Sequence, residues 1–470
     1  MDQTLSENLR LALEAQRAAY RAEPMPSLAA RRDRLQRVLE MTRKHADEIA
    51  AAISRDFGHR SRHETLLADI ATVEIAARHA LRHLPRWMRQ RRMPTALHYL
   101  PSRNRLIAQP LGVVGVIAPW NYPYQLAMSP ALAALAAGNR VLIKPSELTP
   151  ETSALMARLV GEYFAPEEMR VITGDVAVGR AFAALPFDHL FFTGSTTVGK
   201  AVAQAAAQNL TPVTLELGGK SPALVHPSAD IALAAERIAF GKLINAGQTC
   251  IAPDYLLVPR EMQAAMVDAI VAAVRRLYPT IASNPDYSSI AGDRFHARLR
   301  ELIDDAQAKG AKPIPTHDES TAGGRKLVPH LLLDVNDSMT VMQQEIFGPL
   351  LPVVPYDSEH QALDYITRRE RPLALYWFGR DGAARDRALT QTHAGGVTVN
   401  GSIWHIGQED QPFGGVGASG QGDYHGVWGF HTFTKLKPVF VESRLSGTRL
   451  FHPPYGAVFE RLLGLLRRIA

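Results

Sequence analysis

The sequence predicts an α/β protein in which parallel strands alternate with helices. Short apolar runs are separated by helical stretches in two successive blocks of the chain, and Gly, Pro or Ser turns follow the runs, a pattern typical of βαβ units. The 470 residues allow two or three domains at roughly 150 residues each. With 46% hydrophobic and 21% charged residues, the composition excludes a disordered chain and a bundle of membrane spans.

The first hundred residues are helical in pattern. Ser27 is a suitable N-cap for a helix whose apolar residues recur near the 3.6-residue period, and a second helical pattern runs from residue 63 to about 84. A basic run surrounds Trp87 after this helix. We interpret that run as a solvated face in preference to an anion or nucleic-acid site.

Strands are predicted from residue 105 onward. The first block has apolar runs at 113–117, 141–143, 170–172, 190–192 and 213–215, and the second block, from about 221 to 392, includes strands at 223–225 and 255–258 and a helix at 261–278. Residues 111–139 carry no charge, but three prolines divide them into a buried strand, a loop and a helix. Residues 414–420 and 435–441 predict a loop and then a strand outside both sheets.

Charge and cysteine content limit the function classes. Lys and Arg (52) exceed Asp and Glu (46) by 6, a smaller excess than a dedicated nucleic-acid binder should carry. Cys250 is the single cysteine, which excludes an intrachain disulfide and is typical of a reducing compartment. The histidines show no metal-ligand spacing, and no export signal is visible. We therefore expect a cytoplasmic protein with no metal site, no nucleic-acid partner and no integral membrane span.

Residues 190–209 suggest a phosphate site. An apolar strand leads through a glycine-containing turn into an Ala-rich helix, which would aim free N–H groups and the positive helix end at an anion. Gly194 and Gly199 do not form the usual dinucleotide fingerprint, and Ala201 stands where a nucleotide P-loop needs a hydroxyl group. A phosphate site and a plain turn that requires small residues stay equally supported by this segment.

Cys250 is the candidate nucleophile, in the string NAGQTCIAPD. A lone cysteine is usually a small buried apolar residue, whereas these polar flanks suit a partly accessible thiolate. A thiolate nucleophile also needs a base or a positive field and an oxyanion donor. The sequence spacing does not locate those partners.

Carboxylates follow two of the predicted strands. Glu216 ends an apolar run in TLELGGKSP, while Lys144 and Glu147 follow another in VLIKPSELTP. Strand ends line the sites of α/β proteins, and a carboxyl among apolar residues gains the raised pKa that a general base needs near neutrality. The alternatives are a surface position for Glu216 and a simple helix start after Lys144.

Seven short sequence motifs together resemble those of one protein family, although no single motif is specific enough to indicate it. They are PWNYP (119–123), KPSE (144–147), FTGST (192–196), LELGGKSP (215–222), GQTC (247–250), EIFGP (345–349) and PFGGVGASG (412–420). With these strings in this order, the chain closely resembles the NAD(P)-dependent aldehyde dehydrogenases over nearly its whole length. It looks most like the coniferyl aldehyde dehydrogenases and the class 3 aldehyde dehydrogenases, through DFGHRSRHET (56–65), NAGQTCIAPDY (245–255), SNPDY (283–287) and GDYHGVWGF (422–430).

The resemblance implies a role for each catalytic candidate. Cys250 would attack the aldehyde to form a thiohemiacetal, and the Asn121 amide with the Cys250 backbone N–H would stabilise the oxyanion. Hydride transfer to the nicotinamide would leave a thioester. Glu216 would then activate the water that hydrolyses this thioester to the acid.

The resemblance also implies a cofactor site. Its residues would be Lys144 and Glu147 at the adenosine ribose, Gly194 and Ser195 at the pyrophosphate, Glu345 and Phe347 at the nicotinamide ribose, and Trp120. A carboxylate at position 147 would repel a 2′-phosphate. NAD is therefore the expected cofactor, with NADP as the alternative.

The implied architecture combines two α/β domains and an arm. Residues 1–217 would form a Rossmann-like NAD-binding domain interrupted by an arm hairpin at 97–109, and residues 218–394 a smaller catalytic domain. Residues 395–423 would return to the cofactor domain and the active-site mouth, and residues 424–470 would supply an oligomerisation strand and the C-terminal tail of a homodimer. The basic amphipathic pattern of 456–470 suits packing against the protein itself or a neighbouring subunit better than a peripheral membrane contact.

The expected substrate is an aromatic aldehyde such as coniferyl aldehyde, or a medium- or long-chain aliphatic aldehyde. Trp404 is expected near the substrate mouth, and Ala418, Gln421 and Asp423 depart from the subfamily pattern. A CoA-acylating enzyme and a non-catalytic binding protein on the same fold are the alternatives. Glu216 in the general-base position favours hydrolysis over CoA transfer.

Overall fold

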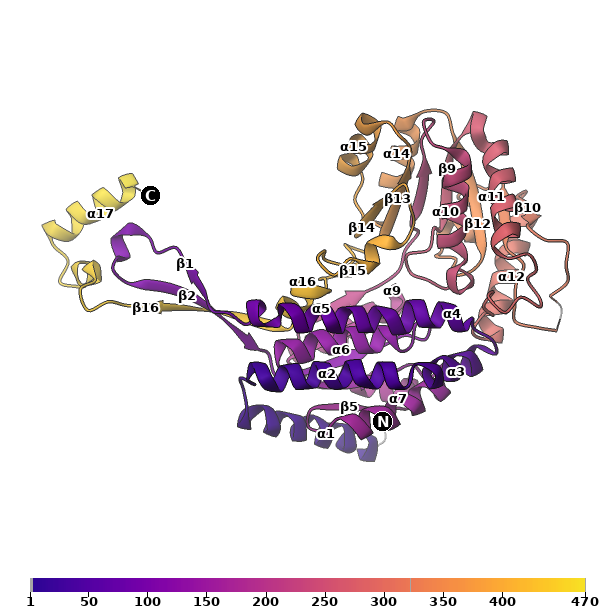
Figure 1. The fold of residues 1–470 in the computed structure, drawn as a ribbon. Coiled ribbons are helices and arrows are strands. Elements are labelled where there is room, and N and C mark those ends of the chain that lie inside the picture. The colour runs from indigo at the N-terminus through magenta and orange to yellow at the C-terminus, as the bar shows by residue number, and fades with distance from the viewer. Residues whose placement is uncertain (1–2, 322, 470) are drawn as a thin grey trace.

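The computed structural model describes residues 3–321 and 323–469, and the first of its mainly parallel sheets has six strands (Figure 1). The sheet order is β15-β7-β6-β3-β4-β5, with only β15 antiparallel to its neighbour. Its strands are β3 (Val113–Ile117), β4 (Arg140–Lys144), β5 (Met169–Val171), β6 (His189–Thr193), β7 (Val213–Glu216) and β15 (Gly420–Gln421). From β3 the chain adds β4 and β5 on one side of the sheet, and it then adds β6 and β7 on the other side. Open α/β sheets form a ligand crevice at such a reversal of strand order, here between β3 and β6.

The second sheet has seven strands in the order β10-β11-β12-β9-β8-β13-β14, and only β10 is antiparallel. Its strands are β8 (Pro222–Val225), β9 (Tyr255–Pro259), β10 (Lys312–Pro315), β11 (His330–Leu333), β12 (Leu350–Tyr356), β13 (Ala374–Phe378) and β14 (Gly396–Val399). Two sheets of mainly parallel strands confirm the predicted α/β class. Because β14 pairs with β13, this sheet continues past residue 394, where we expected the second domain to end.

A third sheet forms an arm that extends away from the body (Figure 1). β2 (Arg103–Pro110) lies between β1 (Arg91–Met93) and β16 (Thr434–Val441), and both neighbours are antiparallel to it. The strand predicted at 435–441 is confirmed outside both larger sheets. The hairpin itself starts earlier than the predicted 97–109, because the basic segment RRM pairs with β2 although it is exposed and has no apolar alternation.

Helices cover the sheets, and one helix lies fully inside the body. They are α1 (Gln3–Ala22), α2 (Leu28–Lys44), α3 (Ala46–Phe57), α4 (Arg62–Thr65), α5 (Thr72–Trp87), α6 (Gln125–Ala137), α7 (Pro150–Tyr163), α8 (Val176–Ala183), α9 (Thr196–Ala207), α10 (Ile231–Leu243), α11 (Gln263–Leu277), α12 (Asp293–Ala308), α13 (Thr340–Gln343), α14 (Glu359–Thr367), α15 (Gly382–Gln391), α16 (Gly426–Thr432) and α17 (Ala457–Ile469). Every residue of α6 is buried, against α2, α5 and α16 among others, which explains the uncharged sequence. Ser27 caps α2 as predicted, with its Oγ accepting the Ala30 N–H at 3.2 Å.

The C-terminal segment forms the predicted amphipathic helix, α17, at the end of the arm (Figure 1). Residue 470, the last residue of that prediction, lies outside the described residues. Within residues 3–321 and 323–469, no helix has the length and apolarity needed to cross a bilayer.

Candidate active site

The site residues emerge at the carboxyl edge of the six-stranded sheet. β3 leads into the turn 119–121, β6 leads into Gly194 and Ser195, and β7 ends at Glu216. β3 and β6 are paired directly, so the first two turns lie side by side at the point where the strand order reverses. The order of the strands therefore brings together residues almost a hundred positions apart in sequence.

A cavity of about 640 Å³ opens at this edge. The predicted site residues that line it are Trp120, Asn121, Gly194, Ser195, Glu216, Cys250, Glu345 and Phe347. Lys144 and Glu147 are not part of the lining. Lys144 ends β4, the neighbour of β3, and its Nζ lies 3.6 Å from a carboxylate oxygen of Glu147.

One wall of this cavity suits a phosphate group. Ser195 is the N-cap of α9 and accepts the Val198 N–H at 3.4 Å, so the positive end of this helix points toward the cavity edge. Gly194 packs over the ring of Phe192, where a Cβ would lie 2.6 Å from a ring carbon. The donor set and the small residues fit a dinucleotide pyrophosphate.

Cys250 follows a backbone segment in the left-handed region. Asn245, Ala246 and Gly247 have φ values of 52°, 51° and 78°. A Cβ at Gly247 would lie 2.3 Å from the Gly348 carbonyl oxygen, so the segment packs closely on the EIFGP turn. Asn245 and Ala246, which carry a Cβ, store strain in this region, which surrounding contacts must offset.

The Cys250 thiol is kept in its neutral form. Burial and, to a smaller extent, the nearby carboxylates of Glu345 and Glu216 together raise its pKa to about 12, because low polarity and negative charge both oppose a thiolate. At neutral pH the resting thiol is therefore protonated. Its attack on a carbonyl requires a group that accepts the thiol proton.

Glu216 lines the same cavity as Cys250. Its side chain is buried, and neither carboxylate oxygen has a hydrogen-bond partner among the described residues. Burial, with a smaller contribution from the charge of Asp423, raises the pKa of Glu216 well above its usual value. A buried and unsatisfied carboxyl contributes nothing to stability, which marks Glu216 as a functional residue.

Glu345 lies against the glycines of LELGGKSP. A Cβ at Gly218 would lie 2.2 Å from a Glu345 carboxylate oxygen, and the Gly219 backbone donates a hydrogen bond to this carboxylate. Burial, and then the charge of Asp254, raises the pKa of Glu345 to about 8. The sequence pattern did not single out Arg298, which holds the Glu345 turn by donating to the Glu345 and Ile346 carbonyls at 2.6 and 2.8 Å.

Asn121 is buried beside the segment that carries the nucleophile. Its Nδ2 donates to the Gln248 carbonyl at 3.1 Å, two residues before Cys250. The backbone carbonyl of Asn121 accepts hydrogen bonds from the Arg60 guanidinium at 2.9 Å and from the Asn245 side-chain amide at 3.0 Å. The amide is thereby fixed next to the Cys250 segment.

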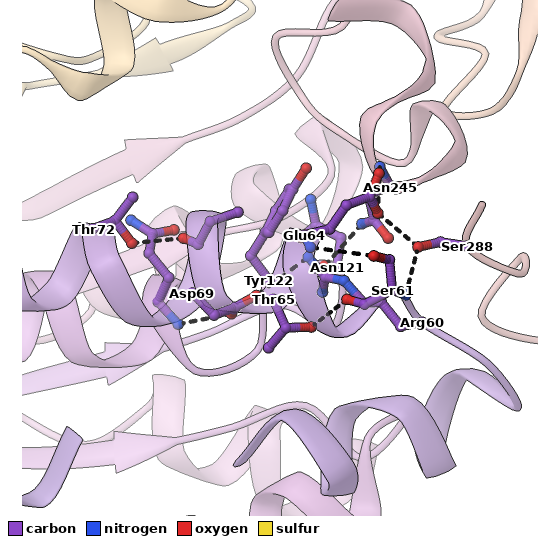
Figure 2. A network of polar contacts seen from close by, with 12 residues as sticks. Arg60, Ser61, Glu64, Thr65, Asp69, Thr72, Asn121, Tyr122, Asn245 and Ser288 are labelled. Carbon is purple, nitrogen blue, oxygen red and sulfur yellow. Dashed lines mark hydrogen bonds and ion pairs between the residues drawn. The ribbon is translucent and has the colours of Figure 1, made fainter. Parts of the chain in front are cut away.

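Arg60 belongs to a buried polar network that the sequence pattern did not reveal (Figure 2). It forms a fully buried ion pair with Asp69 at 3.2 Å, and Asp69 accepts the N–H of Gln125, the first residue of α6, at 3.1 Å. Arg60 lies within the string DFGHRSRHET and Asp69 follows it, but only the folded chain brings both residues next to the Asn121 turn. Their hydrogen bonds hold that turn in place.

Glu64 supports the strained segment from the same network (Figure 2). Both of its oxygens lie 3.1 Å from the Asn245 N–H, and it also accepts a hydrogen bond from the Ser288 hydroxyl at 2.6 Å. Ser288 in turn accepts the Ser61 N–H at 3.2 Å. Three distant segments therefore meet behind Cys250.

A second cavity, of about 130 Å³, is lined by the two sequence neighbours of Cys250. Its inner end includes Tyr122, Thr249 and Ile251, the sequence neighbours of Asn121 and Cys250, with the Tyr122 hydroxyl 2.6 Å from the Thr249 hydroxyl. Most of its remaining wall is apolar: Leu67, Ala68, Ile75, Ile244, Ile403, Trp404 and Ile406. Trp404 is 51% exposed and stacks on Phe240, in agreement with its expected place near the substrate mouth.

Metal ligation is not supported by any cluster in residues 3–321 and 323–469, where no three His, Cys, Asp or Glu side chains are grouped suitably.

Known proteins resemble this chain over almost its full length. The family model described as "Aldehyde dehydrogenase family" matches residues 2–439. A probable coniferyl aldehyde dehydrogenase of Pseudomonas aeruginosa is 50% identical over 448 residues, covering 95% of this chain and 94% of the relative. A coniferyl aldehyde dehydrogenase of a Pseudomonas species is 45% identical over 466 residues, covering 98% and 96%.

Solved structures agree with these matches. The substrate-bound AldH of Staphylococcus aureus is 36% identical and superposes with a TM-score of 0.92, covering 97% of this chain and 99% of that one. An aldehyde dehydrogenase of Bacillus cereus in complex with NAD+ is 27% identical with a TM-score of 0.83, covering 93% and 89%. The chain therefore belongs to the aldehyde dehydrogenase family, NAD(P)-dependent oxidoreductases that oxidise aldehydes to carboxylic acids.

Proposed function

We propose that this enzyme oxidises aromatic aldehydes of the coniferyl type to their acids, with NAD as the hydride acceptor. The observation that carries this proposal is the apolar cavity lined by Tyr122, Thr249 and Ile251, the sequence neighbours of Asn121 and Cys250. Apolar walls favour a flat, largely apolar substrate, and Trp404 and Ile406 flank its approach. The relatives named as coniferyl aldehyde dehydrogenases support the same substrate class.

The proposed chemistry follows from the order of groups around Cys250. Its sulfur bonds to the aldehyde carbon while Glu216 accepts the thiol proton, and the Asn121 amide with the Cys250 N–H stabilises the resulting oxyanion. Bound NAD would accept the hydride from the former aldehyde carbon, which leaves a thioester on Cys250. Glu216 releases the thiol proton to solvent and then takes a proton from the water that attacks the thioester. It returns this proton to the Cys250 sulfur as the acid leaves, so the thiol reforms.

The cofactor preference rests on two residues beyond the cavity. Lys144 pairs with Glu147 at the carboxyl end of β4, and burial lowers the pKa of Lys144. A 2′-phosphate would bring further negative charge beside the Glu147 carboxylate. NAD therefore has the advantage over NADP, in the binding mode that places the adenosine ribose at Lys144.

The arm supports a homodimer. It extends from the body with exposed apolar side chains, among them Leu97 and Leu445 at 73% and 85% exposure. A second copy of the chain would cover this surface, and α17 would pack on that copy in preference to a membrane. The division into two domains stays a prediction, except that β14 extends the second domain past residue 394. The cytoplasmic location also stays a prediction.

Turnover of an aldehyde panel tests the proposed substrate class. We expect NADH formation with coniferyl aldehyde and benzaldehyde at a higher kcat/KM than with hexanal and decanal, and faster with NAD than with NADP. Product analysis should give the free acid, without a requirement for CoA. Oxidation of only the alkanals would refute the aromatic substrate class, and acyl-CoA formation would refute hydrolysis.

A further inference from the structure

The second cavity has a polar end that the aldehyde chemistry does not use. Glu409 and His425 line it together with Ser129 of α6. Ser129 accepts a hydrogen bond from the Gln125 amide at 3.3 Å. These polar groups stand in contrast to the aliphatic and aromatic walls of the rest of the cavity.

The polar end lies apart from the reacting carbon. Gln125 begins α6 directly after the turn that holds Asn121, and Ser129 lies one turn further along the helix, an advance of about 6 Å. Glu409 and His425 also border a small void beyond Ser129, next to Ala133 and Ala136, farther along the same helix. A substrate whose aldehyde reaches Cys250 would thus lie along α6 and direct its opposite end at Glu409.

Both polar side chains have capacity to bind a ligand. One Glu409 oxygen accepts the Gly426 N–H at 3.2 Å, and the other has no donor among the described residues. His425 is only 7% exposed, and its Nδ1 has no partner in the described part of the chain. Burial lowers the pKa of His425 to about 4, so its neutral ring offers one donor and one acceptor nitrogen.

The buried, unpartnered Nδ1 of His425 is destabilising until a ligand satisfies it, whereas Glu409 is partly exposed and its free oxygen would exchange solvent for a ligand. The second Glu409 oxygen accepts hydrogen bonds, and the His425 ring accepts or donates one. A phenolic hydroxyl, which donates one hydrogen bond and accepts others, matches this pair. An alkyl chain or a methoxy group offers no donor to Glu409.

We propose that Glu409 and His425 recognise the ring hydroxyl of a hydroxyaryl aldehyde and so determine substrate specificity. This inference rests on the proposed oxidation of coniferyl-type aldehydes and adds that the enzyme recognises the ring hydroxyl of the substrate. Glu409 accepts the phenolic O–H, and His425 contacts the same oxygen. A substrate without the hydroxyl leaves Glu409 desolvated and unpaired, and reacts less efficiently.

A matched substrate pair tests the proposal. Coniferyl aldehyde and its 4-O-methyl ether differ only at the ring hydroxyl, so the ratio of their kcat/KM values isolates its recognition. We expect a ratio of about 10 to 100 in the wild type, which corresponds to about 1.5–3 kcal/mol for a hydrogen bond to a charged group. Glu409→Leu should bring the ratio near one, and Glu409→Gln, which keeps an acceptor, should retain part of it.

Asp410→Asn is the control variant. Asp410 is the next residue, is exposed, and pairs with His79 at 3.0 Å without lining the cavity. This variant should keep the wild-type ratio. A wild-type ratio near one would overturn the proposal. The same ratio in Glu409→Leu as in the wild type would also overturn it, because a purely structural role for Glu409 changes kcat/KM equally for both substrates.

Binding of coniferyl alcohol and its 4-O-methyl ether, measured by calorimetry, separates this inference from the proposed function. Tighter binding of the free phenol, lost in Glu409→Leu, supports hydroxyl recognition even if neither aromatic aldehyde is oxidised, an outcome that would refute the proposed function alone. Equal oxidation of both aldehydes with equal binding of both alcohols would refute hydroxyl recognition alone.

Discussion

Cys250, Glu216 and Glu345 line one cavity, and each of the three is harder to ionise there than in water. Burial is the largest cause for all of them, and the two carboxylates add to the pKa of the thiol. Burial thus disfavours the charged form of each group. The nucleophile therefore needs its proton removed during the reaction, which we propose the ionised form of Glu216 does; its oxygens have no hydrogen-bond partner among the described residues.

Glu345→Gln should lower the pKa of the Cys250 thiol. The Glu345 pKa is about 8, so this carboxylate is ionised where the thiol titrates, near 12, and its charge opposes thiolate formation. Removing that charge should make alkylation by iodoacetamide faster than in the wild type at every pH above about 8. The rate measured against pH checks this. Glu301→Gln, an exposed position on α12, serves as control, and a Glu345→Gln profile that coincides with the wild type would contradict the assignment.

The positions of single site residues were predictable only in part. Motif strings identified Cys250, Glu216 and Asn121, because these residues stand in short segments with distinctive neighbours. The roles of Glu64 and Glu409 depend on contacts with Asn245 and Gly426, far away in sequence. Contacts of that kind leave no local pattern to detect.

At the scale of elements, the helical stretch from α4 to α5 connects the fold to the site. It carries Glu64 and Asp69, and Arg60 directly precedes it. Arg60 and Asp69 form an ion pair with both side chains fully buried, and Arg60 also lies over the Tyr122 ring at 4.7 Å. Breaking such a pair leaves an unpaired charge in the interior.

Asp69→Ala should lower the free energy of unfolding by about 3–5 kcal/mol, because it leaves the Arg60 guanidinium buried without its partner. Asp47→Ala removes the partner of Arg62 from an exposed ion pair and should cost about 1 kcal/mol or less. Urea unfolding of both variants measures the difference. Equal losses would show that the buried pair does not stabilise the fold in this way.

Strands were predictable where a short apolar run lay between turn residues. The runs at 113–117 and 190–192 match β3 and β6 within a residue at each end, because burial on both faces of a parallel sheet demands continuous apolar sequence. β1 was missed because RRM is exposed and charged. The pairing of β14 was missed because a partner strand is not encoded in a strand's own sequence.

At the scale of the whole molecule, the arm is a surface without a partner in a single chain. Phe440 and Val441 of β16 are about half exposed, and β16 is an edge strand of its sheet. Exposed apolar edge strands favour pairing with another chain. The arm is therefore the part of the molecule best suited to join two copies.

Light scattering during gel filtration should give twice the mass of one chain. Phe440→Lys combined with Val441→Lys should shift the protein toward the monomer, because two charges would have to be buried in the interface. Leu11→Lys, at an exposed apolar position on α1, is the matched control and should stay dimeric. A wild-type monomer, or a double variant that stays dimeric, would contradict the role of the arm.

The two cavities lie on either side of the Cys250 segment: Cys250 lines the one whose groups suit the dinucleotide, and its neighbours Thr249 and Ile251 line the apolar one. This arrangement allows the substrate to stay bound to the sulfur while its hydride passes to the dinucleotide side. We propose that the thioester on Cys250 is the central intermediate and that its hydrolysis depends on Glu216. Glu216→Gln should slow that step by at least about 10²-fold.

The most direct measurement is the intact mass of Glu216→Gln after mixing with coniferyl aldehyde and NAD. The variant also lacks the group that accepts the thiol proton, so we expect acylation to be slow but hydrolysis to be slower still. After long incubation it should carry an added feruloyl group on Cys250 and release one equivalent of NADH, with no adduct when Cys250→Ala is combined with Glu216→Gln. If the wild type turns over but Glu216→Gln gains no acyl group and forms no NADH over the same incubation, the covalent mechanism with Glu216 as the hydrolytic base is contradicted.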